Sequence, residues 1–423
     1  MAYVADLHIH SRFSRACSSQ LTIANLSKWA KIKGIDLIGT GDFLHPLWQA
    51  ELKRDLYDKG NGIFEHDGVK FLLTSEISCI YLDKGKTRRI HLLICLPSFE
   101  VLGKLTSEFL KRRINISSDG RPITGLSAKE LSEIVWSIVP TGIIIPCHVW
   151  TPWFSLFGSE SGYDFLTECF EDLSDKIYAI ETGLSSEPAM NWRIAELDDK
   201  AIVSFSDAHS LSNLGRESTI FSGNLSFDEL LSDLVNQNIK GTIEFFPEEG
   251  KYHYTGHRNC GVVYSIKDLA EKGVICPKCG KKLTVGVMQR VEDLASRETD
   301  DLELITDNGV VKSKKFPKRP GFRMLVQLSA VIAEAYDLGS SSQKVQNMLD
   351  LMIAQLGPEL KILTKLSLDQ IKAVAGSKIT EGIDRVRQGQ LHIEPGYDGT
   401  YGVVKIWGED NNDNNAAVQI GLF

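Results

Sequence analysis

The segment that decides the fold is YVADLHIH, at residues 3–10. Its apolar residues alternate with polar ones, as in a strand with one covered face, and it ends on His8 and His10. Because alternate residues of a strand point to the same side, these two imidazoles are expected to be neighbours. Similar apolar runs recur through the first 245 residues, separated by segments of helical periodicity such as 21–33 and 126–139. This alternation predicts an α/β protein with a parallel sheet or barrel.

Histidines and acidic residues occupy the ends of these predicted strands. The carboxyl ends of barrel strands converge on one face, where active sites are built, so distant parts of the sequence meet there. We predict that residues at these positions are catalytic and bind metal: His8, His10, Asp42, Glu76, His148, Asp207 and His209. His91, in RIHLLI, is predicted to join them as a ligand. Glu181, in AIETG, has two open interpretations, a further ligand or a partner that orients one.

This ligand set indicates the chemistry of the site. Closely spaced imidazoles suit divalent transition metals, and added carboxylates let several metals share bridging ligands. We expect two to three divalent ions: Zn, Mg or Mn. A phosphodiester attacked in line needs an activated water and neutralisation of the charge developing on oxygen, and bridged metals roughly 3.5–4 Å apart supply both. No Ser–His or Cys–His nucleophile pair is evident, so a metal-dependent hydrolase of phosphate esters is predicted.

A second metal-like spacing follows the predicted sheet. His257-x2-Cys260, then fifteen residues, then Cys276-x2-Cys279 is the spacing of a structural site with four ligands, which predicts one structural Zn. His253 competes with His257 for the fourth position, and the two-residue gap favours His257. Residues 291–320 are polar and basic, and we expect a loop-rich linker there.

Two further segments suggest contacts with nucleic acid. Residues 366–389 have helical periodicity on either side of Ala375-Gly376-Ser377, similar to a helix-hairpin-helix element, which would make Gly376 and Lys378 DNA contacts. An ordinary helical hairpin packed on the barrel is the alternative. In the loop WTPWF, Trp150 and Trp153 could stack on a DNA base or, equally, close the barrel mouth by packing.

The last residues carry a possible docking motif. Residues 408–415 (GEDNNDNN) are of low complexity and are expected to be disordered. The final QIGLF resembles the Gln-Leu-x-Leu-Phe motif by which bacterial replication proteins dock on the sliding clamp. Gln419, Leu422 and Phe423 are the residues that would bind this partner.

The order of the strand-end motifs is similar to that of a known superfamily. DLHIHS, GTGD, SEI, IHLL, PCH and SDAH resemble the metal-binding motifs of the polymerase-and-histidinol-phosphatase (PHP) superfamily over about residues 1–245. The resemblance implies a distorted (β/α)7 barrel with up to three metals. Many members have Thr-Asp-His where this chain has Gly41-Asp42-Phe43, so one histidine ligand is missing. Either His45 substitutes for it or the third metal is held weakly.

The chain as a whole resembles the endonuclease Q family, through the PHP barrel, the zinc segment and a helical part containing KITEGIDRVR. The resemblance implies a DNA-repair endonuclease that hydrolyses the phosphodiester 5′ of deaminated bases (uracil, hypoxanthine, xanthine) and abasic sites through a metal-bound hydroxide. Two alternatives stay open. One is a PHP phosphatase acting on a small phosphate ester, and the other is an inactive clamp-associated DNA-binding protein.

The domain organisation and location follow from length and composition. A chain of 423 residues exceeds what one core usually organises. We predict a PHP metallohydrolase barrel at 1–247, a zinc-binding segment at 248–290, a helical C-terminal domain at 291–407 and a disordered tail at 408–423.

The net charge of −8 disfavours a whole-surface nucleic-acid binder but permits local basic patches. No apolar run nears the roughly 20 residues that span a bilayer, and no signal peptide is evident. We therefore expect a cytoplasmic protein with DNA and no membrane as a partner.

Overall fold

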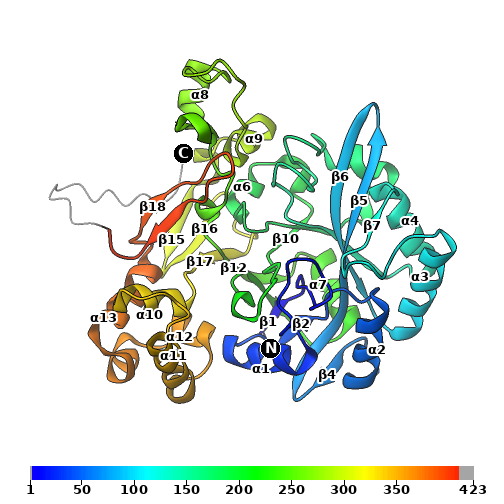
Figure 1. Ribbon diagram of the computed structural model, residues 1–423, viewed down its shortest axis with the longest axis horizontal. Coiled ribbons are helices and arrows are strands. Elements are labelled where there is room, and N and C mark those ends of the chain that lie inside the picture. Colours follow the sequence, from blue (N-terminus) through cyan, green and yellow to red (C-terminus); the bar gives the residue numbers. More distant parts are fainter. Residues whose placement is uncertain (1, 409–423) are drawn as a thin grey trace.

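The computed structural model describes residues 2–408, which are built around one mixed sheet (Figure 1). The order of its main path is β15-β16-β17-β12-β11-β1-β2-β5-β4-β3, with β6 joining β5 to β8 and β7 pairing with β5. The 13 strands are β1 (Ala2–Asp6), β2 (Leu37–Gly39), β3 (Tyr57–Asp58), β4 (Phe64–His66), β5 (Val69–Asp83), β6 (Lys86–Leu96), β7 (Ile123–Thr124), β8 (Ile143–Pro146), β11 (Ser218–Ser222), β12 (Ile239–Glu244), β15 (Leu304–Asp307), β16 (Val310–Ser313) and β17 (Gly321–Met324).

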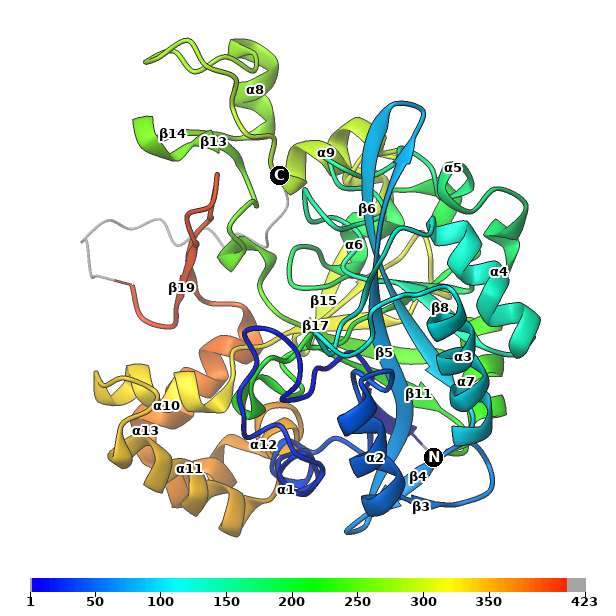
Figure 2. The ribbon, with the colours of Figure 1, turned by 45° about the vertical axis from the view of Figure 1, so that its right-hand side comes forward.

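Parallel pairing holds the centre of the sheet, where β1 pairs with β2 and β2 with β5. The long strands β5 and β6 form an antiparallel hairpin that rises from the sheet (Figure 2). Its two-residue turn, Lys84-Gly85, has positive φ at both residues, as a type I′ turn requires. Strands β9 (Ala179–Glu181) and β10 (Ala201–Val203) pair with each other in parallel. The N–H of Val149, just after β8, donates to Glu181 O, so this pair lies beside β8.

Helices cover the outside of the sheet. They are α1 (Ile23–Lys33), α2 (Pro46–Asp55), α3 (Phe99–Lys111), α4 (Ala128–Ile138), α5 (Leu166–Phe170), α6 (Pro188–Trp192) and α7 (Phe227–Val235). Local signals fix their ends, since Thr22 caps α1 and Gly34 ends it with φ of 87°. Ser127 and Glu130 form a capping box on α4. The apolar faces of these helices bury a core between helices and sheet.

The segment after the sheet has a small core of its own. It contains the antiparallel pair β13 (Thr255–His257) and β14 (Val262–Tyr264), followed by α8 (Ile266–Lys272) and α9 (Val287–Leu294). Its apolar centre consists of Val262, Tyr264, Leu269, Cys276 and Leu283. So few buried side chains contribute little hydrophobic stability, and a bound metal is a common supplement in segments of this size.

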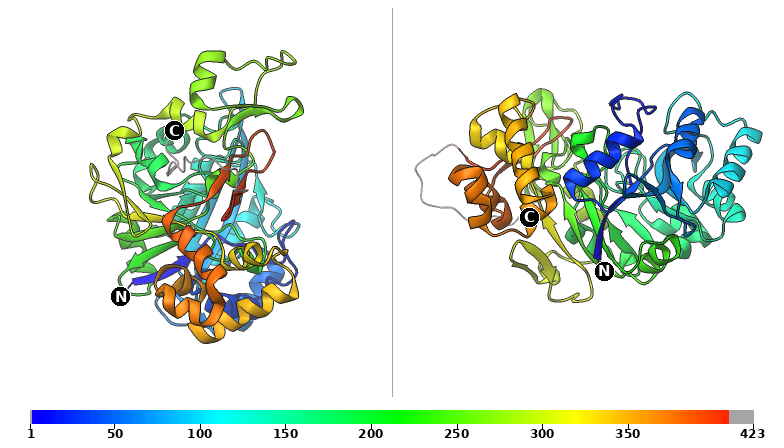
Figure 3. Two further views of the ribbon diagram at one scale, coloured as in Figure 1. Left: turned by 90° about the vertical axis from the view of Figure 1, so that its left-hand side faces the viewer. Right: turned by 90° about the horizontal axis from the view of Figure 1, so that it is seen from below.

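Helices α10 (Leu328–Tyr336), α11 (Gln343–Leu356), α12 (Glu359–Thr364) and α13 (Leu368–Gln388) form a bundle beside α1, and the strand pair β18 (His392–Glu394) and β19 (Val403–Lys405) follows it (Figure 3). A buried ion pair joins bundle and sheet layer, because Lys33 Nζ lies 2.9 Å from Glu359 Oε2. The mixed α/β fold with a helical C-terminal region is therefore confirmed, while the count of seven barrel strands stays a prediction.

The loop-rich linker expected at 291–320 is correct for about half of its residues. The other half lie in regular elements, with α9 ending at Leu294 and β15 and β16 forming a hairpin that adds to the sheet. The two-residue turn Asn308-Gly309 has positive φ at both residues, and Leu302 is fully buried beneath the hairpin. An Asn-Gly turn between alternating residues is a strong hairpin signal, which the high charge of the segment obscured.

Two further observations concern segments named in the sequence. Among residues 2–408, no helix is long and apolar enough to cross a membrane. The predicted docking residues Gln419, Leu422 and Phe423, and the low-complexity stretch from 409 onward, lie outside the described residues.

Candidate metal centre

His8 and His10 lie just beyond the end of β1. A bridge between Ile9 and Ala208 holds this segment against the loop after β10, and His10 N donates to Ala208 O over 3.1 Å. Both imidazoles are completely buried, and their ring centroids are 5.6 Å apart. The alternation of the strand therefore brings both rings to one side, as the sequence predicts.

Glu76, in the middle of β5, is shared by the surrounding histidines. Its Oε1 lies 3.2 Å from His148 Nε2 and 3.8 Å from His8 Nε2, and it is also paired with His91 Nδ1. Its Oε2 lies 3.4 Å from His10 Nε2. A buried carboxylate whose two oxygens face different imidazoles has the arrangement of a bridging ligand.

Asp207 and His209 complete the cluster from the loop after β10. Asp207 Oδ1 lies 3.0 Å from His10 Nε2 and 3.7 Å from His8 Nε2. The His209 ring lies 4.5 Å from the His10 ring. Burial opposes ionisation of Asp207, but its hydrogen bond with His10 and the charge of His8 outweigh burial and lower its pKa. Asp207 is thus held as a carboxylate, the form that binds metal.

Three groups of ligands built from these residues overlap. In each group the ligand atoms lie within 4.8 Å of one another, and the groups are His8, His10 and Glu76; His10, Asp207 and His209; and Glu76, His91 and His148. His10 and Glu76 each belong to two groups, which favours more than one metal. His8 Nε2 is buried without a hydrogen-bond partner among the described residues, as a metal-ligating nitrogen would be. The residues therefore fit a cluster of divalent ions.

Two predicted ligands lie behind the histidines and orient them. His8 Nδ1 lies 2.9 Å from Glu181 Oε1, and the backbone N–H of His148 donates to Glu181 Oε2 over 2.8 Å. Asp42 Oδ1 lies 3.1 Å from His10 Nδ1, while its Oδ2 accepts from the N–H and hydroxyl of Ser11. A carboxylate on Nδ1 leaves Nε2 as the ligand atom. The geometry thus gives Asp42 an orienting position and favours the same interpretation of Glu181.

Within residues 2–408, His45 does not take the place of the missing histidine. Phe43, which stands at that position, is completely buried in the hydrophobic core. His45 Nε2 lies 3.2 Å from Ser117 O, and its ring stacks on Phe13 with centroids 4.4 Å apart. His45 therefore belongs to none of the ligand groups described above.

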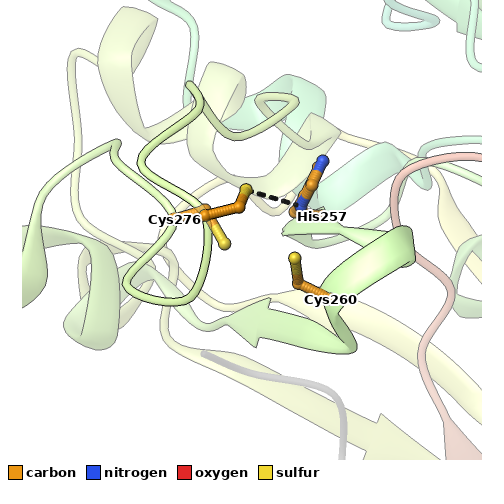
Figure 4. A group of neighbouring side chains, drawn as sticks. His257, Cys260 and Cys276 are labelled. Atoms are coloured by element: carbon orange, nitrogen blue, oxygen red, sulfur yellow. Dashed lines mark hydrogen bonds between the residues drawn. The ribbon is translucent and has the colours of Figure 1, made fainter.

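The predicted zinc ligands also converge. His257, Cys260, Cys276 and Cys279 offer ligand atoms within 4.8 Å of one another. Figure 4 shows the side chains of His257, Cys260 and Cys276 close together. His257 is the last residue of β13 and Cys260 follows it closely, whereas Cys276 and Cys279 lie in the loop after α8. His253 is buried elsewhere and is not in the group, so the geometry favours His257 as the fourth ligand.

The two tryptophans in the aromatic loop after His148 differ in burial. Trp150 is completely buried, packs 5.0 Å from Phe157 and donates its indole N–H to Asn191. A base cannot stack on it here, so the predicted DNA contact at Trp150 gives way to a packing role. Trp153 is only half-buried, and its ring lies 5.3 Å from that of Tyr252.

The predicted hairpin element is a break within α13. Gly376 has φ of 77° and ψ of 174°, which interrupts the helix between Ala375 and Ser377. Gly376 and Lys378 are exposed, and Lys378 Nζ lies 4.0 Å above the ring of Trp407. The break leaves exposed backbone at the start of a second helical segment, as a phosphate-binding element needs.

Arg121 was not among the predicted residues. Its Nη1 lies 2.9 Å from Glu76 Oε2, so a guanidinium faces the carboxylate that the histidines share. It lies in the loop SSDGRP, outside any strand, where no periodicity marks a residue as inward-facing. A basic residue also runs against the expectation of a metal site, so nothing in the sequence singled it out.

In sequence, the chain is similar to one family model and to two relatives. Residues 327–390 match the family model of the MJ0043 C-terminal domain. The chain is 28% identical over 421 residues to the uncharacterized protein YqxK of Bacillus subtilis strain 168, covering 95% of this chain and 98% of that protein. It is 29% identical over 267 residues to the uncharacterized protein MJ0043 of Methanocaldococcus jannaschii, covering 61% of this chain and 31% of that longer protein.

Two solved structures match almost the whole chain. The lesion-specific endonuclease PfuEndoQ of Pyrococcus furiosus is 32% identical, with a TM-score of 0.81, and the match covers 96% of this chain and 95% of that one. Endonuclease Q in complex with a 27-mer duplex substrate, with an abasic lesion at the active site, is 31% identical, with a TM-score of 0.82, covering 97% and 98%. The mixed sheet and its cluster of shared histidine and carboxylate ligands define a metal-dependent hydrolase. Within that class, the chain belongs to the endonuclease Q family.

Proposed function

We propose that this protein is a DNA-repair endonuclease that hydrolyses the phosphodiester 5′ of deaminated bases (uracil, hypoxanthine and xanthine) and of abasic sites. The observation that carries the proposal is the cluster shared through Glu76, in a chain similar over nearly its full length to a lesion-specific endonuclease and to an enzyme bound to an abasic duplex. Two to three divalent ions, Zn, Mg or Mn, would occupy the cluster.

The residues of the cluster have separate tasks. Metals bound there would lower the pKa of a coordinated water and neutralise charge on the attacked phosphate. Glu76, His10 and Asp207 hold these ions close together, because each faces more than one ligand neighbour. Glu181 and Asp42 fix the imidazoles of His8 and His10, so that the Nε2 atoms face the cluster.

The remaining parts bind and position DNA. One Zn on His257 and the three cysteines would stiffen the segment that carries Tyr252, whose ring adjoins Trp153. A base turned out of the stack needs a flat apolar surface, and turning it out costs least where it is damaged or mispaired. The exposed Gly376 and Lys378 would contact a backbone phosphate.

The proposed division of the chain follows these tasks. The hydrolase part spans 1–247, the zinc-binding segment 248–290, and the helical domain 291–407. Strands β15, β16 and β17 of this last part extend the sheet through β12, and the Lys33–Glu359 ion pair joins its helices to α1. For the tail, docking of Gln419, Leu422 and Phe423 on a bacterial sliding clamp rests on the sequence alone.

Duplexes that differ in one residue test the substrate class. Labelled duplexes with a single uracil, hypoxanthine, xanthine or abasic site, and an undamaged control, are incubated with the protein and Mg²⁺ or Mn²⁺. We expect a nick 5′ of each lesion, none in the control duplex, and loss of nicking in His8→Ala and Asp207→Asn. Release of phosphate from a small ester while all duplexes stay intact would instead support a phosphatase.

A further inference from the structure

A cation beside the shared carboxylate of a metal cluster is an unusual feature. Arg121 Nη1 lies 2.9 Å from Glu76 Oε2. The side chain of Arg121 is 28% exposed to solvent, so it lies at the open side of the cluster. The side chain of Glu76 is not exposed. The guanidinium has several N–H groups, and among residues 2–408 we find no hydrogen-bond acceptor for it other than Glu76. Arg121 therefore has donors to spare at the open side of the site.

The loop that carries Arg121 is fixed on both sides. Gly120 N donates to Phe13 O over 3.0 Å, and Pro122 O accepts from the backbone N–H of Ser78 in β5 over 3.0 Å. A Cβ at Gly120 would lie 2.4 Å from Asp42 Oδ2, so only glycine permits this approach of the loop to the cluster. The backbone of Arg121 is thus held beside the cluster independently of the contact between its guanidinium and Glu76.

The charge of the occupied site argues for an anionic partner. Divalent ions on Glu76 would leave Arg121 close to two or more further positive charges, without the full charge of its present partner. Such a cation is stable beside metals only when an anion lies between them. A phosphodiester supplies one negative charge and two non-bridging oxygens, and guanidinium groups match phosphate oxygens in geometry.

We propose that Arg121 is a catalytic residue that donates to a non-bridging oxygen of the scissile phosphate when metals occupy Glu76. The inference rests on the proposed function, because the phosphate is that of the cleaved DNA strand. Arg121 would stabilise the charge that develops on this oxygen as the linkage breaks.

The test compares two DNA linkages in two proteins. Duplexes with one abasic site carry either the natural phosphodiester 5′ of the lesion or a methylphosphonate diastereomer, which replaces one non-bridging oxygen by methyl. Binding is measured by fluorescence anisotropy with Ca²⁺ in place of Mg²⁺, with intact substrate verified on a gel. The proteins are wild type, Arg121→Gln and Arg121→Lys. Arg112→Gln serves as a control that removes a guanidinium paired with Glu108 on the surface of α3.

Wild type and Arg112→Gln should bind the natural linkage about tenfold more tightly than one methylphosphonate diastereomer. Arg121→Gln should lose this discrimination, and its kcat/KM for nicking with Mg²⁺ should fall about 10²–10³-fold. Arg121→Lys keeps the charge and should keep part of both effects. Metal content, measured by mass spectrometry, should not change.

Two other results have distinct meanings. If Arg121→Gln still discriminates between the linkages as wild type does, Arg121 is only a counter-ion of Glu76 and the inference is wrong, whatever its metal content. If wild type neither binds nor nicks any lesion duplex, the proposed function itself is wrong.

Discussion

The carboxylate of Glu181 offers the sharpest prediction about how the cluster is built. Glu181 is buried, with only 1% of its surface exposed. Its two carboxylate oxygens lie 2.9 and 3.0 Å from His8 Nδ1. It also accepts the backbone N–H of His148 over 2.8 Å. Glu181→Gln keeps the shape but leaves one oxygen for these donors and turns an amide N–H₂ toward the other. His8 would then lose the partner that fixes its ring.

The magnitude follows from these contacts. A buried hydrogen bond to a charged group contributes about 1.5–3 kcal/mol, and loss of an orienting partner usually weakens metal binding about 10–100-fold. We therefore expect the Kd for Mn²⁺, measured by calorimetry on metal-stripped protein, to rise by about 10–100-fold. Nicking should fail at low Mn²⁺ and recover at high Mn²⁺, because the ligand atoms themselves remain.

A matched variant separates orientation from packing. Glu196 is another carboxylate that accepts backbone N–H groups, those of Leu166 and Thr167, but it has no hydrogen bond with a histidine among residues 2–408. Glu196→Gln should leave the Mn²⁺ affinity unchanged. An unchanged Mn²⁺ affinity in Glu181→Gln as well would refute the orienting role that we give to Glu181.

Four more predictions concern other parts of the chain. Cys276→Ser should remove one equivalent of zinc, measured by mass spectrometry, because a tetrahedral site seldom survives with three ligands; full zinc content would contradict this site. Lys33→Met should destabilise the fold by about 3–5 kcal/mol in urea unfolding, since Glu359 is left buried and unpaired, and the double change with Glu359→Leu should restore much of the loss. Burial raises the pKa of Glu244 from 4.5 to about 8, so the stability that its proton provides is present below pH 4.5 and is lost as the pH rises through 8. Unfolding of wild type should show this loss, on the order of 3 kcal/mol between pH 5 and 8, and Glu244→Gln should reduce it; parallel profiles would show that Glu244 is not responsible. Deleting 419–423 should abolish binding to a sliding clamp in surface plasmon resonance without changing the nicking rate, and retained binding would end the docking proposal.

Much of the sheet could be predicted from local patterns. The apolar run before His8 and His10 became β1, and the run ending at Glu76 lies within β5. The prediction missed the hairpin at Asn308-Gly309. Its strands have one solvent-exposed face with charged residues, and this composition is also typical of a linker. The lateral order of the strands was also beyond local patterns, since the parallel pairing of β12 with β17 joins segments about 80 residues apart.

Part of the metal site could also be predicted from local sequence patterns, and part could not. Residues directly after strands, such as His148 and Asp207, could be foreseen because strand ends converge. Whether a carboxylate binds metal or orients a histidine could not be foreseen. Asp42 lies after β2 and Glu76 lies in the middle of β5, and the role of each depends on which atoms face it. Trp150 and Trp153 are separated by two residues in one loop, and only backbone geometry decides which ring is buried.

The central claim is that the cluster around Glu76 cuts DNA beside a lesion by metal-dependent hydrolysis. The most direct measurement is a single-turnover reaction on an end-labelled duplex with one abasic site, resolved to the nucleotide, using protein stripped of metal and then given Mn²⁺. The account predicts one cut, 5′ of the lesion, that appears only after Mn²⁺ is added and is absent in Glu76→Gln. A cut at that position by wild type without metal, or undiminished cutting by Glu76→Gln, would contradict it.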